Sequence, residues 1–233
     1  MKHWPEAQLH RLQHLTDEGD ILQTAFQLAH DMGFDYLGFA TAPSTSTAQL
    51  EGVSNLPIAW CTRYQQQGYV RHDPTVRHCR HSVVPLLWSD TVFSPTPVLR
   101  RDAWAHGIRH GLSLAVHGTC GQMSMLSLIR EELAVSADEF CLKAGHCLWL
   151  GNLLHQRLSG QLLNPLDGSH GHLSKREVEV LRWSAQGKTA GDIGAILSLS
   201  ERTVNFHISS AVKKLGMGNK TAAIVHAAQA GLL

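Results

Sequence analysis

The run YVRHDPTVRHCRH, from Tyr69 to His81, places three histidines, three arginines, a cysteine and an aspartate within thirteen residues. Imidazole, thiolate and carboxylate groups can bind Zn²⁺ or transfer protons. No C-x-x-C or H-x-x-x-H spacing surrounds them, so we expect neither a metal site nor a cofactor here. Cys79 is expected to be a buried apolar residue. Asp73, directly before Pro74, is the residue of this run that we expect to matter, although Asp-Pro is also typical of a plain turn or helix start.

Three further runs resemble catalytic motifs without completing them. GKT at 187–189 lacks the earlier glycine of a phosphate-binding loop, because position 182 is arginine, and it follows a helix pattern instead of a strand. GLSLA at 111–115 lacks the final glycine of a nucleophile elbow. His170 and His172 are followed by serine and lysine where a zinc lactonase motif requires aspartate and histidine. No catalytic residues are therefore predicted, and the chain is not expected to be an enzyme.

The cysteines and the apolar residues bear on location. Five cysteines without a C-x-x-C pair argue against a disulfide framework and favour reduced thiols. The N-terminus MKHWPEAQLH lacks the layout of a signal peptide, and no run of about 18 apolar residues is present. We expect a cytoplasmic protein without a membrane partner.

The charges of the chain are unevenly distributed. From His172 onward there are eight Lys or Arg and four Asp or Glu residues, whereas the remainder has twelve and fifteen. A basic module attached to a slightly acidic body suggests that the module binds a polyanion. The polar segment NPLDGSHGH has the composition of a linker, so we predict domains at 1–163 and 173–233, joined by residues 164–172.

The N-terminal domain mixes strand and helix patterns. Strands are predicted at 34–40, 112–118 and 122–129, the last two joined by a Thr-Cys-Gly turn. Helices are predicted near 6–31, 57–67 and 136–158, where apolar residues recur at three- and four-residue spacing. This mixture favours an α/β domain, an α-β-α sandwich with helices on both faces of a sheet.

The C-terminal domain is predicted to be wholly helical. Ser174 and Glu177 have the S-x-x-E spacing of a capping box, which starts a helix that ends near Gln186, before Gly187. A short helix at 189–197, a third capped by Ser200, and a fourth at 219–230 follow. Two short helices joined by a tight turn form a helix-turn-helix, so an all-α four-helix DNA-binding domain is predicted.

Both domains resemble the LuxR family of quorum-sensing transcription factors. The run LSKREVEVLRWSAQGKTAGDIGAILSLSERTVNFHISSAVKKLG is similar to the family's DNA-binding domain, with Glu177, Leu181 and Gly187 at characteristic positions. The N-terminal part resembles the family's acyl-homoserine-lactone-binding domain and carries its characteristic residues Trp60, Tyr64, Asp73, Pro74, Trp88 and Gly111. The runs GYVRHDPTVRHCRHSVVPLLW, GIRHG and MLSLIR are most similar to the long-chain receptors of the LasR and QscR type.

The resemblance implies a set of ligand-binding residues. It assigns the Trp60 N–H to the lactone carbonyl and the Asp73 carboxylate to the amide N–H, which suits a donor-only indole and an acceptor-only carboxylate. Ser127 matches the serine that contacts the acyl carbonyl. The remaining predicted wall residues are Tyr64, Trp88, Leu56, Gly38 and Val76. Without the resemblance, the aromatic residues among them would be read as ordinary core.

Three of these positions depart from relatives. Leu56 stands where many relatives have a tyrosine that donates to the acyl carbonyl, Gly38 replaces a small polar residue, and Cys61 follows Trp60 where an arginine can stand. A hydrogen bond contributes about 1 kcal/mol and a buried methylene about 0.8 kcal/mol. Leu56 therefore favours burial of a medium or long acyl tail, and preference for a 3-oxo group is left open.

In the third C-terminal helix, Val204 and Ile208 should face the core. Asn205, Phe206 and Ser209 would then point away, toward base edges, which matches the family's base-reading positions; the alternative is that Phe206 is core. Side chains predicted to contact phosphate are Lys188, Thr189, Thr203, Lys213 and Lys214, although Thr203 could merely support the helix start.

These inferences combine into one expected function. The chain is predicted to bind an N-acyl-homoserine lactone, to form a homodimer through the helix at 136–158, and to regulate transcription from a pseudo-palindromic site on double-stranded DNA, with RNA polymerase as a further partner. Two alternative functions remain: a regulator of the same fold that senses another small molecule, and a phosphorylation-controlled response regulator. The second requires an acidic cluster and a distal lysine that we do not find.

Overall fold

The computed structural model describes residues 11–43, 50–118, 122–163, 173–229 and 231–233. The chain divides into two compact units, one that ends at Leu163 and one that begins at Asn164. The predicted linker at 164–172 and the predicted turn at 119–121 lie outside the described residues. Within the described ranges, no helix is long and apolar enough to cross a membrane.

The first unit is built on a five-stranded sheet in the order β2-β1-β5-β4-β3. The strands are β1 (Tyr36–Pro43), β2 (Glu51–Ser54), β3 (Leu86–Leu87), β4 (His110–His117) and β5 (Gln122–Arg130), and every pairing is antiparallel. The central strands β4 and β5 are buried on both faces. Gly111 is required in β4, because a Cβ atom there would lie 2.4 Å from the carbonyl oxygen of Leu128. The three predicted strands are thus confirmed, and β2 and β3 are additional.

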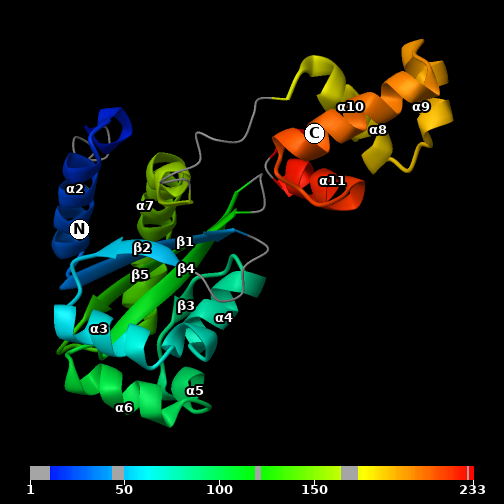
Figure 1. The fold of residues 1–233 in the computed structure, drawn as a ribbon. Coiled ribbons are helices and arrows are strands. Elements are labelled where there is room, and N and C mark those ends of the chain that lie inside the picture. The colour runs from blue at the N-terminus through cyan, green and yellow to red at the C-terminus, as the bar shows by residue number, and fades with distance from the viewer. Residues whose placement is uncertain (1–10, 44–49, 119–121, 164–172, 230) are drawn as a thin grey trace. The chain divides into compact units, whose positions relative to one another are not determined.

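Helices α2 (Glu18–Asp31) and α7 (Ala137–Leu163) cover one face of this sheet (Figure 1). Between them and the strands lies the largest apolar core, whose members are fully or almost fully buried. It includes Ile21, Leu28, Phe34, Leu37, Phe39, Leu112, Leu114, Leu126, Leu128, Leu150, Leu154 and Leu158. This face of the sheet is closely packed.

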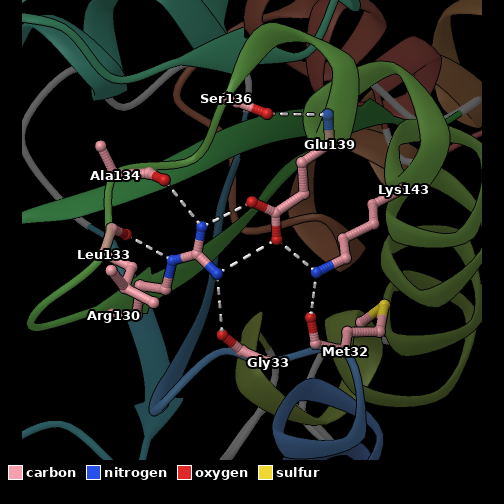
Figure 2. A network of polar contacts seen from close by, with 8 residues as sticks. All are labelled: Met32, Gly33, Arg130, Leu133, Ala134, Ser136, Glu139 and Lys143. Carbon is pink, nitrogen blue, oxygen red and sulfur yellow. Dashed lines mark hydrogen bonds and ion pairs between the residues drawn. The ribbon is translucent and has the colours of Figure 1, made fainter.

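A polar network fixes the start of α7 to the end of α2 (Figure 2). Arg130, at the end of β5, donates to Glu139 Oε2 at 2.6 Å and to the carbonyl oxygens of Leu133 and Ala134. Lys143 donates to Glu139 Oε1 and to the carbonyl oxygen of Met32, each at 2.5 Å. The hydrogen bond from Arg130, joined by that from Lys143, outweighs the opposing effect of burial and lowers the pKa of Glu139 to about 2.

Four shorter helices cover the other face of the sheet (Figure 1). They are α3 (Ile58–Gln66), α4 (Pro74–His81), α5 (Asp90–Phe93) and α6 (Pro97–Ala105), with a single 3₁₀ turn, η1, at Tyr69–Arg71. Proline occupies the first position of α4 and of α6, where its missing N–H costs no hydrogen bond. Apolar residues under these helices form two smaller clusters instead of one continuous core.

One predicted helix requires correction. The sequence predicts a single helix over 6–31, but residues 15–17 are not helical, and a new helix begins at Glu18. The physical reason is capping: the side chain of Asp17 accepts a hydrogen bond from the N–H of Asp20 at 3.0 Å, which satisfies a free donor at the start of α2. Residues 6–10 of the predicted helix lie outside the described residues.

The second unit has four helices within its described residues, α8 (Lys175–Ala185), α9 (Ala190–Leu197), α10 (Glu201–Lys214) and α11 (Lys220–Gln229). The predicted capping box is confirmed, because Glu177 N–H donates to Ser174 Oγ and Ser174 N–H donates to Glu177 Oε2. Gly187, at φ 81°, ends the first helix as predicted. Helices α9 and α10 form the helix-turn-helix.

Candidate functional site

A cavity of about 500 Å³ lies in the first unit, between the sheet and the four short helices. Its wall is predominantly apolar. Apolar lining residues come from strands, helices and loops: Ala40, Leu50, Val53, Leu56, Val70, Val76, Phe93, Leu99, Ala103, Ile108, Met125 and Ile129. A cavity of this volume with few polar groups is typical of a small-molecule site. All eight residues that the sequence assigns to ligand binding line it: Gly38, Leu56, Trp60, Tyr64, Asp73, Val76, Trp88 and Ser127.

Asp73 is both a helix cap and a cavity wall. Its Oδ1 accepts hydrogen bonds from the N–H of Thr75 at 2.8 Å and from Thr75 Oγ1 at 2.6 Å, so it caps α4. Its Oδ2 accepts from the hydroxyl of Tyr64 at 2.9 Å. Burial raises the pKa of Asp73 although these hydrogen bonds oppose it, and no lysine or arginine pairs with the carboxylate in the described structure. The plain reading as a helix start is correct, and the carboxylate also faces the cavity.

Trp60 is held by aromatic neighbours. Its ring stacks on Tyr69 at 6.2 Å between centroids and meets Tyr64 edge-on at 5.5 Å. Tyr69 in turn donates to Asp102 Oδ2 at 2.7 Å, and Asp102 also pairs with Arg63 at 2.8 Å. Among the described residues the indole N–H of Trp60 has no hydrogen-bond partner, so this donor is available to a bound molecule.

Trp88 differs from Trp60, because its N–H is already used. It donates to Ser113 Oγ at 2.9 Å, and Ser113 Oγ lies 2.9 Å from Ser127 Oγ. Ser113 is fully buried, whereas Ser127 reaches the cavity. Across the sheet, Gly38 pairs with Ser127, and a Cβ atom at position 38 would lie 3.5 Å from Leu56 Cδ1. A Cβ atom at position 38 would therefore make only an ordinary van der Waals contact with Leu56.

Sequence reasoning missed several residues at this site. Thr75 lines the cavity and supports Asp73, and the two-residue spacing after an Asp-Pro helix start is a signal that could have indicated it. Arg100, also in the wall, donates to the carbonyl oxygen of Arg109 at 2.7 Å and lies over the Phe93 ring. The whole of α6 was missed, although Pro97 is typical of a first helical position. No feature of the sequence indicated a role for Ser113.

His78 and Cys79, two potential metal ligands of the histidine-rich run, have surroundings that the structure describes. In the ranges that the structure describes, no group of three His, Cys, Asp or Glu side chains could hold a metal ion. His78 is 2.7 Å from the carbonyl oxygen of Val84. Cys79 is fully buried, and burial, together with the nearby Asp73 charge, raises its pKa to about 12.

In the second unit, α10 presents a polar face to solvent. Val204 and Ile208 are buried, as predicted, while Asn205, Phe206 and Ser209 are exposed. Phe206 is 68% exposed, so the alternative that it belongs to the core is wrong. The exposed Phe206 and its polar neighbours lie on α10, the second helix of the helix-turn-helix.

The predicted phosphate contacts fall into two groups. Lys188 and Lys213 are exposed. Thr189 and Thr203 have local bonds at helix starts, Thr189 Oγ1 to Asp192 at 2.7 Å and Thr203 Oγ1 with Ser200 Oγ at 2.8 Å.

Lys214 forms an ion pair at 2.8 Å with the buried Glu177, which also accepts from Ser210 at 2.7 Å. Burial would raise the pKa of Glu177, but these hydrogen bonds and that from Ser174 lower it to about 2. Lys214 therefore has a structural partner as well.

Comparison with known proteins agrees with this architecture. Residues 17–158 match the family described as "Autoinducer binding domain", and residues 171–227 match "Bacterial regulatory proteins, luxR family". The chain is 32% identical to the transcriptional activator AnoR of Acinetobacter nosocomialis, with 100% of both chains covered. It is 32% identical to the quorum-sensing regulator RhlR of Pseudomonas aeruginosa, over 99% of this chain and 96% of that protein.

Among solved structures, the fold is similar to SdiA in complex with octanoyl-rac-glycerol, with a TM-score of 0.83 and 29% identity over 98% of this chain and 95% of that chain. The cavity in the α/β domain, the helix-turn-helix and these two family matches define a transcription regulator that responds to a small molecule. The chain belongs to the LuxR family of autoinducer-binding transcription regulators.

Proposed function

We propose that the cavity binds an N-acyl-homoserine lactone through Trp60 and Asp73. The observation that carries this proposal is a free indole N–H and a carboxylate without a cation partner among the described residues, both in one predominantly apolar wall. The Trp60 N–H donates to the lactone carbonyl, the Asp73 carboxylate accepts from the amide N–H, and Ser127 contacts the acyl carbonyl. Tyr64, Trp88 and the smaller wall residues enclose the head group and the start of the tail.

The acyl chain is of medium or long length. Support comes from the apolar lining and from Leu56, which replaces a hydroxyl donor by a side chain suited to a hydrocarbon tail. The similarity of residues 68–88 to long-chain receptors favours the same conclusion. Substitution at the third carbon of the acyl chain is not specified by these residues.

A second candidate ligand is a monoacylglycerol. SdiA has been solved with octanoyl-rac-glycerol, which joins a neutral polar head to an eight-carbon acyl chain. Glycerol hydroxyls would donate to the Asp73 carboxylate as an amide N–H does. The lactone remains the preferred ligand, because one rigid head group carries both matching groups. Its amide N–H suits the Asp73 carboxylate as acceptor, and its lactone carbonyl suits the Trp60 N–H as donor.

Ligand binding would be coupled to DNA binding by a homodimer in the cytoplasm. Two copies present two α10 helices to the half-sites of a pseudo-palindrome. Asn205, Phe206 and Ser209 face the bases, whereas Lys188, Thr189, Thr203, Lys213 and Lys214 face phosphates. The exposed Leu142 and Trp149 of α7 support a dimer contact on that helix. RNA polymerase is the partner through which the bound dimer would act.

The test is the melting temperature and soluble yield of the full chain expressed with lactones of graded acyl length, with and without a 3-oxo group, and with octanoylglycerol. A ligand that binds the native state stabilises it by RT ln(1 + [L]/Kd), about 2.7 kcal/mol at 100 Kd. We expect a gain that grows with acyl length and weakens in Asp73→Asn and Trp60→Phe.

Matched controls are Asp17→Asn, which also changes a helix-capping aspartate, and Trp104→Phe, which changes a 41% exposed tryptophan outside the cavity wall. Both should keep the full ligand response. A larger gain with octanoylglycerol than with every lactone would favour the second candidate. A folded chain without a gain from any of these ligands would contradict both.

A further inference from the structure

Three polar side chains form a chain of hydrogen bonds that crosses the sheet toward the cavity. Trp88 follows β3, Ser113 lies on β4 and Ser127 lies on β5. Ser113 and Ser127 are directly opposite in the β4–β5 ladder, so their side chains lie on the same face of the sheet. The two links, from Trp88 Nε1 to Ser113 Oγ and from Ser113 Oγ to Ser127 Oγ, are each 2.9 Å.

The chemistry of the three groups determines which group donates and which accepts in each of these hydrogen bonds. The indole N–H only donates, so Ser113 accepts from Trp88. Ser113 is fully buried and has no further hydrogen-bond partner among the described residues, so its own hydrogen can go only to Ser127. If Ser127 donated instead, a buried hydroxyl hydrogen would be left without an acceptor, which is costly. Ser127 therefore accepts from Ser113 and keeps its own hydrogen free.

The free hydrogen of Ser127 has no acceptor among the described residues, and the hydroxyl lies in the cavity wall. On the side away from Ser113, the residue paired with Ser127 is Gly38, which has no side chain to accept it. Ser127 itself is part of the cavity wall, whereas Ser113 is not. The partly buried Trp88 and the fully buried Ser113 thus make the Ser127 hydroxyl a donor to whatever occupies the cavity.

We propose that Ser113 is a positioning residue for ligand recognition, which with Trp88 orients the Ser127 hydroxyl so that the cavity selects a carbonyl oxygen at this point. This inference rests on the proposed function, because it concerns how the same cavity reads the polar end of an acyl ligand. Ser113 acts through Ser127 and does not touch the ligand. Trp88 contributes its ring to the wall and its N–H to Ser113, so its N–H is not a ligand contact.

The experiment is a double-mutant cycle on the full chain, with affinity for N-decanoyl-homoserine lactone measured from the dependence of melting temperature on ligand concentration. Ser113→Ala should weaken binding about 3- to 10-fold when Ser127 is present. In the Ser127→Ala background the same change should weaken binding less than about 2-fold, because the hydroxyl that it orients is gone. Trp88→Phe, which keeps an aromatic wall, should weaken binding less than Ser113→Ala and should also lose its effect in that background.

Ser124→Ala is the matched control, since Ser124 is a buried β5 serine that contacts Thr41 and His155 instead of the cavity. It should leave lactone affinity unchanged. An equal loss from Ser113→Ala in both backgrounds, or no loss in either, would overturn the positioning role. If Ser113→Ala does not fold, the cycle with Trp88→Phe is used instead. An equal loss of affinity from Trp88→Phe with and without the Ser127 hydroxyl, or no loss in either background, would then overturn the positioning role. If the wild-type chain itself gains no stability from the lactone, the proposed function fails and this inference fails with it.

Discussion

The two faces of the five-stranded sheet in the first unit differ in how completely their apolar residues are packed. On the α2 and α7 face, leucines from the strands and helices form one continuous core. On the α3 to α6 face, two smaller clusters leave a cavity of about 500 Å³ in the wall. Since protein interiors are normally close-packed, the second face is incomplete until a ligand fills it. Stability is thus concentrated on one face of the sheet and ligand response on the other.

The carboxylates on the two faces differ in the same way. Glu139, beside the packed face, is held by Arg130 and Lys143, and its pKa is lowered to about 2. Asp73, on the cavity face, has hydroxyl and N–H donors but no paired cation within the described structure, and burial raises its pKa. An uncompensated buried carboxylate reduces stability in the free protein and provides a strong acceptor for a ligand N–H.

The largest expected contrast comes from truncation at adjacent positions of β5. Leu126 is fully packed, so Leu126→Ala should destabilise the chain by about 2–5 kcal/mol with or without ligand. Met125 lines the cavity, so Met125→Ala should cost less without ligand, and its cost should grow when ligand is bound. Urea unfolding with and without lactone checks both. Equal costs at the two positions in the free protein would contradict the difference between the faces.

Acid should weaken the packed face through Glu139. Its pKa is about 2 in the folded chain, against an ordinary value of 4.5, so its contribution is present above pH 4.5 and is lost as the pH falls toward 2. The shift corresponds to at most about 3 kcal/mol. Glu139→Gln should lower neutral-pH stability and flatten the acid part of the stability curve. Asp90→Asn, at an exposed carboxylate paired with Arg100, should change stability by less than about 1 kcal/mol.

A side chain that partly fills the cavity should stabilise the free protein and weaken ligand binding. Position 38 faces Leu56 at van der Waals distance, so Gly38→Val can place apolar atoms in the empty space without a backbone clash. We expect free-protein stability to rise by about 1 kcal/mol, since valine suits a strand and buries apolar surface, while lactone affinity falls at least about ten-fold. Gly38→Ala should show smaller changes of the same sign. A fall in both stability and affinity would mean that this part of the wall is already full.

The smallest expected effect on stability is that of Asp73→Asn in the free protein. Asparagine keeps an oxygen to cap α4, and the change removes a carboxylate whose pKa is raised. Wild type should lose stability as the pH rises above 3.8, the ordinary pKa of this carboxyl group, because ionised Asp73 is disfavoured in the folded chain. Asp73→Asn cannot ionise, so it should not show this loss and should gain stability relative to wild type at neutral pH. We expect the free energies of unfolding of the two proteins to differ by less than about 1 kcal/mol. Melting curves at pH 3.5 and pH 7 without ligand measure this, and a clear relative loss at pH 7 would contradict it.

Local sequence signals predicted the second unit well and the first unit only in part. Ser174, Glu177 and Gly187 determine helix ends through bonds with neighbours a few residues away, so their spacing is sufficient. Strand β2 has a short, largely exposed sequence without apolar alternation, and its position depends on pairing with β1. The role of Ser113 depends on partners 14 and 25 residues away, which no local pattern indicates. The cavity residues were predicted by resemblance, because aromatic residues alone indicate ordinary core equally well.

The alternation of side chains along β5 has a consequence for how such receptors diversify. Met125, Ser127 and Ile129 line the cavity, while Leu126 and Leu128 belong to the packed core. Because successive residues of a strand face opposite sides, a change at one set leaves the other set in place. Mutations at every second codon of this short segment can therefore change which ligand the cavity prefers. The codons between them encode the residues of the packed core, which stay the same.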